Sequence, residues 1–293
     1  MTTRRRFLPG GWYPEESDAL RRLVASWTRG RKSDGASGGA LAAVAPHAGW
    51  AFSGRLAALA VSSLSPLPEA STIAVFGGHL PPGARPLAAA ESAFDTPLGP
   101  VQADLGLRSA LEDSLSLRPS FAGRACGASL GRDEDGDNTV EVLLPLIAAI
   151  LPGARVLWLR APNDSASLEL GEALHAAAAA LGRRVACLGS TDLTHYGPNY
   201  GFSPKGSGPE AEAWVRDTND RRFIDSLLAL DGEEALRRAE AERSACSSGA
   251  AAAALAFALA AGASRALLLE YATSLDLRRD ESFVGYAAVG FYK

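Results

Sequence analysis

Short apolar runs alternate with longer helical segments along most of the chain, and this order constrains the fold more than any other feature. Most of the runs are apolar at every position, as strands covered on both faces of a sheet are. The predicted strands are 41–45, 72–78, 155–162, 183–193 and 265–273. The clearest predicted helices are 54–64, 140–151, 167–181, 210–230 and the alanine-rich segment after Cys246. The alternation predicts an α/β fold in which ligands bind beyond the carboxyl ends of the strands.

The length of 293 residues suits one large domain or two small ones, and a hydrophobic content of 47% is that of a packed globular protein. The chain shows no internal repeat and no long linker, so we expect a single domain over residues 1–293. The loosest stretch is YGPNYGFSPKGSGPE at 196–210. We expect this stretch to form a loop or lid near the site and not a domain boundary.

The charge and the cysteine content argue against a nucleic-acid partner and against an oxidising compartment. Lys and Arg total 29 against 33 Asp and Glu, and no dense basic cluster is present, so nucleic acid is not an expected partner. The three cysteines, Cys126, Cys187 and Cys246, are too few and too scattered for a disulfide framework. We therefore expect a reducing compartment and a cytoplasmic location.

Two segments superficially indicate export or membrane insertion. TRRRFL near the N-terminus is similar to a twin-arginine signal, but PGGWYPEESDALRRL follows it where an apolar region should be. The most apolar run, GAAAAALAFALAAGA from Gly249 to Ala263, is shorter than the roughly 20 residues that span a bilayer. We expect neither export nor a membrane partner, and we interpret the alanine run as a buried helix.

Three of the four histidines follow predicted strands. His47 comes after LAAVAP, His79 after TIAVFGG, and His195 closes CLGSTDLTH, so all three can meet at one edge of an α/β sheet. His175 lies inside GEALHAAAAALG, a helix pattern, where we expect a solvated or helix-packing role and not a catalytic one. Each strand-end histidine alone could simply connect loops by hydrogen bonds. Because imidazole is a common ligand of iron, copper and zinc, three together favour a metal site.

Two further side chains extend this hypothesis. Asp192 precedes His195 by three residues and could orient its ring or share its proton, with an N-cap or Asx-turn role after the strand as the competing explanation. Cys246 opens the alanine-rich helix, where a thiol has a lowered pKa, although it could also be a small packing residue. Spacing alone cannot bring Cys246 to His47, and no CxxC or HExxH motif is present.

A set of ordered motifs runs from end to end of the chain. The motifs are RRFLPGGWYP before a Leu-rich helix, APHAGWAFSG, VFGGH, DTPLGPV, TVEVLLPLI, GSTDLTHYG, a Cys that opens a helix, and YATSLD followed by FVGYA. In this order they resemble the Memo family, whose members are also known as component B of the AmmeMemoRadiSam system. The resemblance implies one α/β/α sandwich with a mixed central sheet, similar to LigB-type class III extradiol dioxygenases.

The resemblance also implies a set of site residues. Two histidines and a cysteine form the metal pocket of Memo-like proteins, and they correspond here to His47, His79 and Cys246. The Asp and His of the GSTDLTHYG motif correspond to Asp192 and His195.

This chain departs from the family pattern in two places. The family has Glu-His-Ser-x-Glu before the LP helix, whereas DNTVE places Asn138 at the histidine position and retains Glu141. A neutral amide cannot carry a proton as imidazole does. The cysteine is followed by Ser247 and Ser248 where the family has Gly, so we expect a different pocket wall and a different substrate.

From these implications we expect a mononuclear non-haem Fe(II) oxygenase whose partners are O₂ and an aromatic or other electron-rich small molecule. Copper or zinc are alternative metals. His195 would act as acid and base, oriented by Asp192, with Asn138 and Glu141 behind the metal ligands. The alternatives are a non-catalytic iron-, copper- or peptide-binding protein that uses the same pocket, and a zinc hydrolase with His195 as base.

Overall fold

The computed structural model describes residues 2–29, 39–65, 71–118 and 130–293. Within these residues a central sheet has the strand order β10-β12-β2-β9-β3-β8-β4-β7, and β11 pairs with β12. The strands are β2 (Ala42–Ala45), β3 (Thr72–Leu80), β4 (Leu87–Ala88), β7 (Gly131–Arg132), β8 (Arg155–Pro162), β9 (Val185–Ser190), β10 (His195–Tyr196), β11 (Arg265–Thr273) and β12 (Phe283–Tyr292). A smaller sheet joins β1 (Thr3–Arg4), β5 (Ala93–Phe94) and β6 (Val101–Gln102).

The central sheet is mixed. Strands β2, β9, β3 and β8 run parallel, while β12 is antiparallel to β2, β10 and β11. In the parallel part, β9 lies between β2 and β3, so the carboxyl ends of β2 and β3 reach the same edge of the sheet. The predicted α/β architecture with a mixed central sheet is confirmed.

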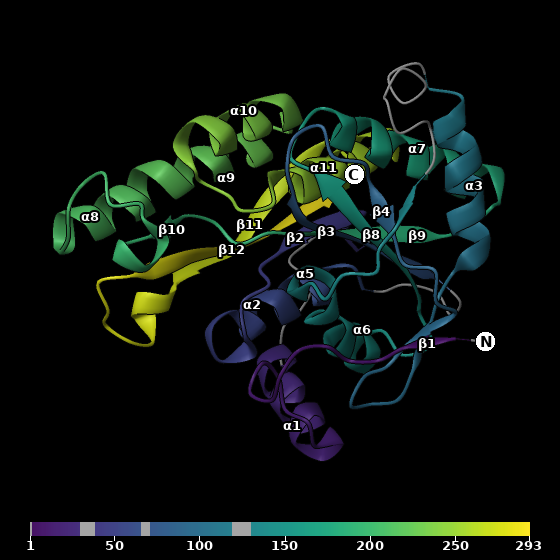
Figure 1. The fold of residues 1–293 in the computed structure, drawn as a ribbon, viewed down its shortest axis with the longest axis horizontal. Coiled ribbons are helices and arrows are strands. Elements are labelled where there is room, and N and C mark those ends of the chain that lie inside the picture. The colour runs from purple at the N-terminus through teal and green to yellow at the C-terminus, as the bar shows by residue number, and fades with distance from the viewer. Residues whose placement is uncertain (1, 30–38, 66–70, 119–129) are drawn as a thin grey trace.

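Helices cover both faces of the sheet (Figure 1). One layer holds α1 (Ser17–Thr28), α2 (Trp50–Ser63), α5 (Asn138–Glu141) and α6 (Leu144–Ile150). The other holds α3 (Leu105–Ser116), α7 (Ala166–Ala180), α9 (Asp220–Leu228), α10 (Gly232–Glu242) and α11 (Ser248–Ala260). The side chains of β3 alternate between two cores, with Ala74 and Phe76 in one and Ile73 and Val75 in the other. This alternation is why a strand buried on both faces is apolar at every position.

The alanine run forms α11, whose side chains from Ser248 to Ala258 are buried. Alanine has no atoms beyond Cβ, so the helix approaches its neighbours closely; an added Cβ on Gly171 of α7 would overlap the backbone of Ala253. No helix in the described part of the chain is long and apolar enough to cross a membrane.

The five predicted strands appear as β2, β3, β8, β9 and β11, but two predicted helices are interrupted. The predicted helix 140–151 is divided into α5 and α6, with Pro145 in the first turn of α6. The predicted helix 210–230 contains a π-helical turn, Val215–Asn219, between α8 (Pro209–Trp214) and α9. A wide turn of this kind inserts one residue into the helical repeat, which a simple 3.6-residue pattern does not reveal.

Strand β12 is a central strand that the sequence patterns did not predict. All ten of its residues are buried, and it pairs with β2, β10 and β11. Its sequence, FVGYAAVGFY, contains two glycines and two alanines, which weaken the local strand signal. Gly285 is required by packing, because an added Cβ would overlap the carboxylate of Asp220.

Candidate functional site

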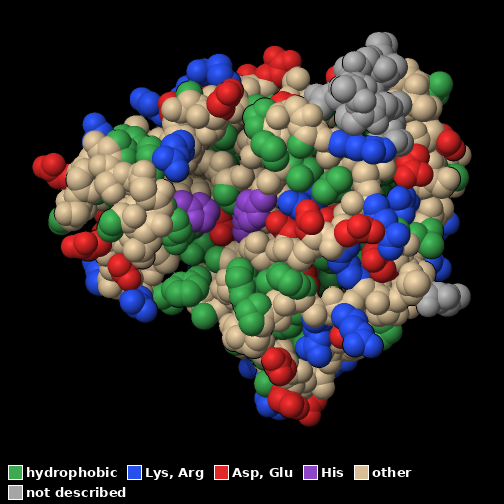
Figure 2. All heavy atoms as spheres, in the orientation of Figure 1, with side chains coloured by type: hydrophobic (Ala, Val, Ile, Leu, Met, Phe, Trp, Pro, Cys, Tyr) green, Lys and Arg blue, Asp and Glu red, His purple; other side chains and the backbone are tan. Residues whose placement is uncertain are grey.

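His47, His79 and Cys246 meet at one edge of the sheet. His47 lies two residues after β2, and His79 is the penultimate residue of β3. Their ring centroids are 5.0 Å apart, and the Cys246 Sγ lies 3.3 Å from the His47 Nε2, although 199 residues separate these two in sequence. One ligating atom from each of the three residues lies within 4.8 Å of the others. Histidine side chains accordingly gather in a hollow of the surface (Figure 2).

The surroundings of His47 fix the position of its ring proton. The Nδ1 atom lies 3.0 Å from the Ser190 Oγ, and the Ser190 hydroxyl donates to the Thr139 carbonyl. Because that hydroxyl proton is already used, the Ser190 Oγ accepts from the His47 Nδ1–H. The Nε2 atom of His47 therefore faces the Cys246 Sγ, and the ring is only 2% exposed.

His79 is held at the same ring atom, Nδ1, by a different partner. Its Nδ1 lies 3.0 Å from the Asp137 Oδ2, and an ionised carboxylate can only accept a hydrogen bond. The hydrogen bond to Asp137, together with the one to Cys246, raises the pKa of His79 to about 10. Unlike His47, this side chain is 37% exposed.

Cys246 is predisposed to be a thiolate. Burial by itself would raise the pKa of the thiol, but the charge and hydrogen bonds of His47 and His79 hold it well below its usual value. The pKa of His47 is in turn raised, since Asp192 and Cys246 outweigh the effect of burial. Cys187 is fully buried, and burial raises its pKa well above the usual value. Cys126 lies outside the described residues.

Asp192 contacts His47, and no hydrogen bond joins it to His195 in the described part of the chain. Its Oδ1 accepts the backbone N–H of His47 at 2.7 Å, and its Oδ2 lies 3.9 Å from the His47 Nε2. Its carbonyl also accepts the backbone N–H of Cys246 at 3.2 Å. Burial raises the pKa of the Asp192 carboxyl. The expectation that Asp192 orients His195 therefore changes, because this residue connects two of the candidate ligands instead.

Asn138 and Glu141 contact different parts of the structure. The Asn138 Nδ2 donates to the His47 carbonyl at 3.1 Å, so Asn138 does lie directly behind a candidate ligand. Glu141 accepts the backbone N–H groups of Phe7 and Leu8 and the hydroxyl of Tyr13. Its carboxylate therefore anchors the N-terminal segment and does not contact the histidines, which corrects its expected place behind the metal ligands.

A cavity of about 360 Å³ opens above the two histidines and also contains His195. The His195 ring packs edge-on against Tyr200 at 4.9 Å, and Tyr200 belongs to the stretch expected to form a loop or lid near the site. Aromatic side chains form much of the wall: Trp12, Phe52, Tyr200 and Tyr286. Polar side chains form the rest: Asn199, Ser274, Arg278, Asp280 and Ser282.

Sequence reasoning did not identify these wall residues. Phe52 and Trp12 could have been noticed because they lie in the APHAGWAFSG and RRFLPGGWYP motifs, Phe52 five residues after His47. Arg278 carries no such signal, since only the tertiary fold brings its segment to the cavity.

A family model described as Memo-like protein matches residues 4–290, which is nearly the whole chain. The chain belongs to the Memo family. A MEMO1 family protein of Pyrococcus abyssi is 31% identical over 300 residues, and one of Methanococcoides burtonii is 29% identical over 288 residues. Each alignment covers 96% of both chains. The predicted family is thus confirmed, and the match to a Memo-like model assigns no reaction.

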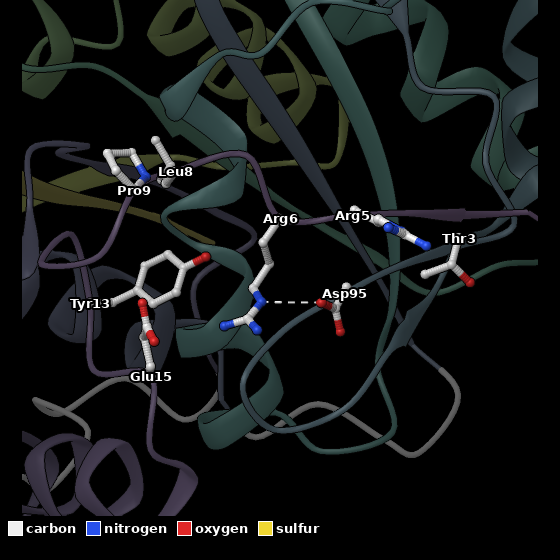
Figure 3. A pocket seen from close by; sticks show the side chains of 8 residues that line it. All are labelled: Thr3, Arg5, Arg6, Leu8, Pro9, Tyr13, Glu15 and Asp95. Carbon is white, nitrogen blue, oxygen red and sulfur yellow. Dashed lines mark hydrogen bonds and ion pairs between the residues drawn. The ribbon is translucent and has the colours of Figure 1, made fainter.

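This Memo chain has a second hollow, of about 730 Å³, at the N-terminal segment (Figure 3). Arg6 points into it and pairs with Asp95 at 3.1 Å. The residues that line this hollow include neither histidine nor cysteine, so its chemistry differs from that of the first cavity. His175 lines neither of these two cavities. It lies on α7, where its ring packs against Phe257 as the helix pattern predicted.

Proposed function

We propose that this Memo-family protein is a mononuclear non-haem Fe(II)-dependent oxygenase that acts on an aromatic or other electron-rich small molecule. The observation that carries the proposal is the convergence of His47, His79 and Cys246, the two histidines of which line the aromatic-walled cavity. Two imidazoles and a thiolate are suitable ligands for iron, and also for copper or zinc.

The three residues fit a metal in their protonation chemistry as well as their positions. The Nδ1 of each imidazole is held by a hydrogen-bond partner, Ser190 or Asp137, so Nε2 is the atom that would coordinate once a metal displaces its proton. The thiol has a lowered pKa, and thiolate is the form that binds metals. When bound, Fe(II) would supply redox chemistry with O₂, and a thiolate ligand would make the metal easier to oxidise than a carboxylate would.

The remaining residues bind substrate and move protons. Trp12 and Phe52 would pack against a planar ring and exclude water from it. His195 lines the same cavity and would take a proton from the substrate or return it at a ring nitrogen. Asp192 would keep His47 and Cys246 in place through its two backbone contacts.

The first experiment is elemental analysis of protein purified without oxygen, in the wild type and in Cys246→Ala, with Cys187→Ala as the matched control. We expect near-stoichiometric iron in the wild type and in Cys187→Ala, and a large loss in Cys246→Ala. Unchanged metal content in Cys246→Ala, or no metal in any sample after iron, copper and zinc are offered, would overturn the proposal.

The second experiment measures O₂ consumption with a panel of catechols and other electron-rich aromatic compounds. We expect consumption that requires both iron and substrate, and we expect His195→Ala to abolish it while retaining the metal. Turnover that proceeds without O₂ in the zinc-loaded protein would instead indicate a hydrolase.

Asn138 favours a second candidate, a binding protein that holds iron or copper, or a peptide, without turnover. The amide donates to the His47 carbonyl and offers no titrating group where the family pattern has a histidine. Tight, stoichiometric iron or copper binding without O₂ consumption for any substrate in the panel would support this candidate.

A further inference from the structure

We propose that Arg160 and Asp137 are positioning residues that together orient the His79 ring, and that the metal affinity of the site depends on them. The inference rests on the proposed metal site and deepens it. It assigns a role to a buried arginine and to a loop that the proposed reaction does not otherwise use.

Burial alone does not fix the position of the His79 side chain. The His47 ring is 2% exposed and bonds to the buried Ser190, whereas the His79 side chain is 37% exposed. The backbone of His79 is left-handed, with φ of 61°, a conformation that non-glycine residues adopt only when neighbouring groups stabilise it. Hydrogen bonds must therefore hold both the backbone and the ring of His79.

Asp137 holds the ring and is itself held at both oxygens. Its Oδ2 lies 3.0 Å from the His79 Nδ1. Its Oδ1 accepts the backbone N–H of Thr139 at 2.9 Å and also the Thr139 hydroxyl. A carboxylate fixed at one oxygen points the other in one direction, so it fixes the rotation of the imidazole. A carboxylate behind a histidine ligand is a general way to orient that ligand and to raise its basicity.

Arg160 connects the carboxylate to the backbone of the same histidine. The guanidinium is almost fully buried, with 6% of the side chain exposed. Its Nε donates to the Gly78 carbonyl at 3.0 Å, next to His79, while its Nη2 lies 3.5 Å from the Asp137 Oδ2. One planar group therefore contacts both the strand end that carries His79 and the carboxylate that orients its ring.

The buried carboxylate of Asp133 supplies the charge that keeps this arginine in place, and Asp135 contacts it only from the surface. The Arg160 Nη1 lies 3.3 Å from the Asp133 Oδ1 and 3.4 Å from the Asp135 Oδ2. Asp133 is fully buried and also accepts from the Trp158 indole, whereas the Asp135 side chain is 74% exposed. A lysine has one nitrogen in place of a rigid fork, so it cannot reach the Gly78 carbonyl and the carboxylates together.

The test compares Co(II) binding to the metal-free, full-length protein without oxygen, in the wild type, Asp137→Asn, Arg160→Lys and Asp135→Asn. An asparagine has one oxygen and cannot serve both His79 and Thr139, so we expect affinity to fall by about 10- to 100-fold in Asp137→Asn. We expect the Co(II) affinity of Arg160→Lys to fall as well. Asp135→Asn changes only the exposed partner of the same guanidinium and leaves the Asp133 and Asp137 contacts in place, so its affinity should equal that of the wild type.

A second readout does not depend on metal and detects a variant that merely fails to fold. In ¹⁵N–¹H spectra of the metal-free protein, we expect a slowly exchanging His79 Nδ1–H in the wild type and in Asp135→Asn. It should be lost in Asp137→Asn, while the remaining spectrum stays that of a folded protein.

The outcomes separate this inference from the proposed function. Equal Co(II) affinity in the wild type and in folded Asp137→Asn, or the absence of the protected His79 proton from the wild type, would overturn the positioning role alone. A wild-type protein that binds no Co(II), iron, copper or zinc would overturn both.

Discussion

The carboxylate of Asp192 accepts the backbone N–H of His47 at 2.7 Å, across a sequence separation of 145 residues. Both residues are nearly fully buried, at 3% and 2% exposed. The bond holds the end of β2 against the segment that follows β9. Because the same aspartate also accepts from Cys246 through its carbonyl, it determines how closely two candidate ligands approach.

Two substitutions of Asp192 distinguish the loss of its charge from the loss of its hydrogen-bond acceptor. Asp192→Ala leaves the buried N–H of His47 without its acceptor, so we expect the free energy of unfolding to fall by about 1–3 kcal/mol. Asp192→Asn keeps one acceptor oxygen and should lose less. Urea unfolding of the metal-free proteins measures both changes, and equal losses in the two variants would contradict this role of the carboxylate.

The two described cysteines should differ in reactivity. In metal-free protein with Cys126→Ala, we expect iodoacetamide at pH 7 to alkylate Cys246 and to leave Cys187 unmodified, since their pKa values are shifted in opposite directions. The rate at Cys246 should rise less with pH than that of an ordinary thiol, because its pKa is lowered. His47→Gln removes the main stabilising partner of the thiolate and should restore the ordinary rise of the rate with pH. Mass spectrometry locates the modification, and preferential labelling of Cys187 would be the contrary result.

Helix packing beneath the site should tolerate no added atom at Gly171. A Cβ there would overlap the Ala253 carbonyl oxygen and lie 2.9 Å from the Phe257 nitrogen, both in the backbone of α11. We expect Gly171→Ala to lower the free energy of unfolding by about 1–3 kcal/mol or more, because backbone atoms cannot move aside. Gly106→Ala in α3 is the control: its nearest neighbour would be 3.6 Å away, and the change should be neutral or stabilising by up to about 1 kcal/mol.

Asp220 should make stability depend on pH in the opposite sense to an ordinary paired carboxylate. Burial raises the pKa of its carboxyl to about 7, even though it accepts hydrogen bonds from Thr194 and Tyr271. The folded protein therefore binds this proton more tightly than the unfolded chain does. Its contribution to the free energy of unfolding must fall as pH rises from about 4 to 7 and stay level above that range.

The comparison with Asp220→Asn isolates this effect, because the other titrating groups are common to both proteins. Denaturant unfolding at several pH values between 4 and 8 should show the wild type losing stability relative to the variant as pH rises. A relative gain, or a difference independent of pH, would show that the carboxyl is not protonated in the folded protein near neutrality.

Local patterns in the sequence were enough to predict the α/β class, most of the strands and the positions of His47 and His79 at strand ends. Apolar runs of strand length mark β2, β3, β8 and β9, and parallel strands bring their carboxyl ends to one edge. The position of Cys246 beside these histidines did not follow from its spacing. It was implied by the resemblance to the Memo family, which the ordered motifs carry.

The partner that each polar side chain contacts depends on the tertiary structure. Local sequence predicted neither the glycine-containing strand β12 nor the attachment of Glu141 to the N-terminal segment. Asp192 lies three residues from His195 in sequence, yet its carboxylate bonds to His47, and Asp137 and Arg160 reach His79 from separate elements. These contacts join residues far apart in the chain, and the direction of a buried hydrogen bond depends on how the surrounding layers pack, which no local pattern encodes.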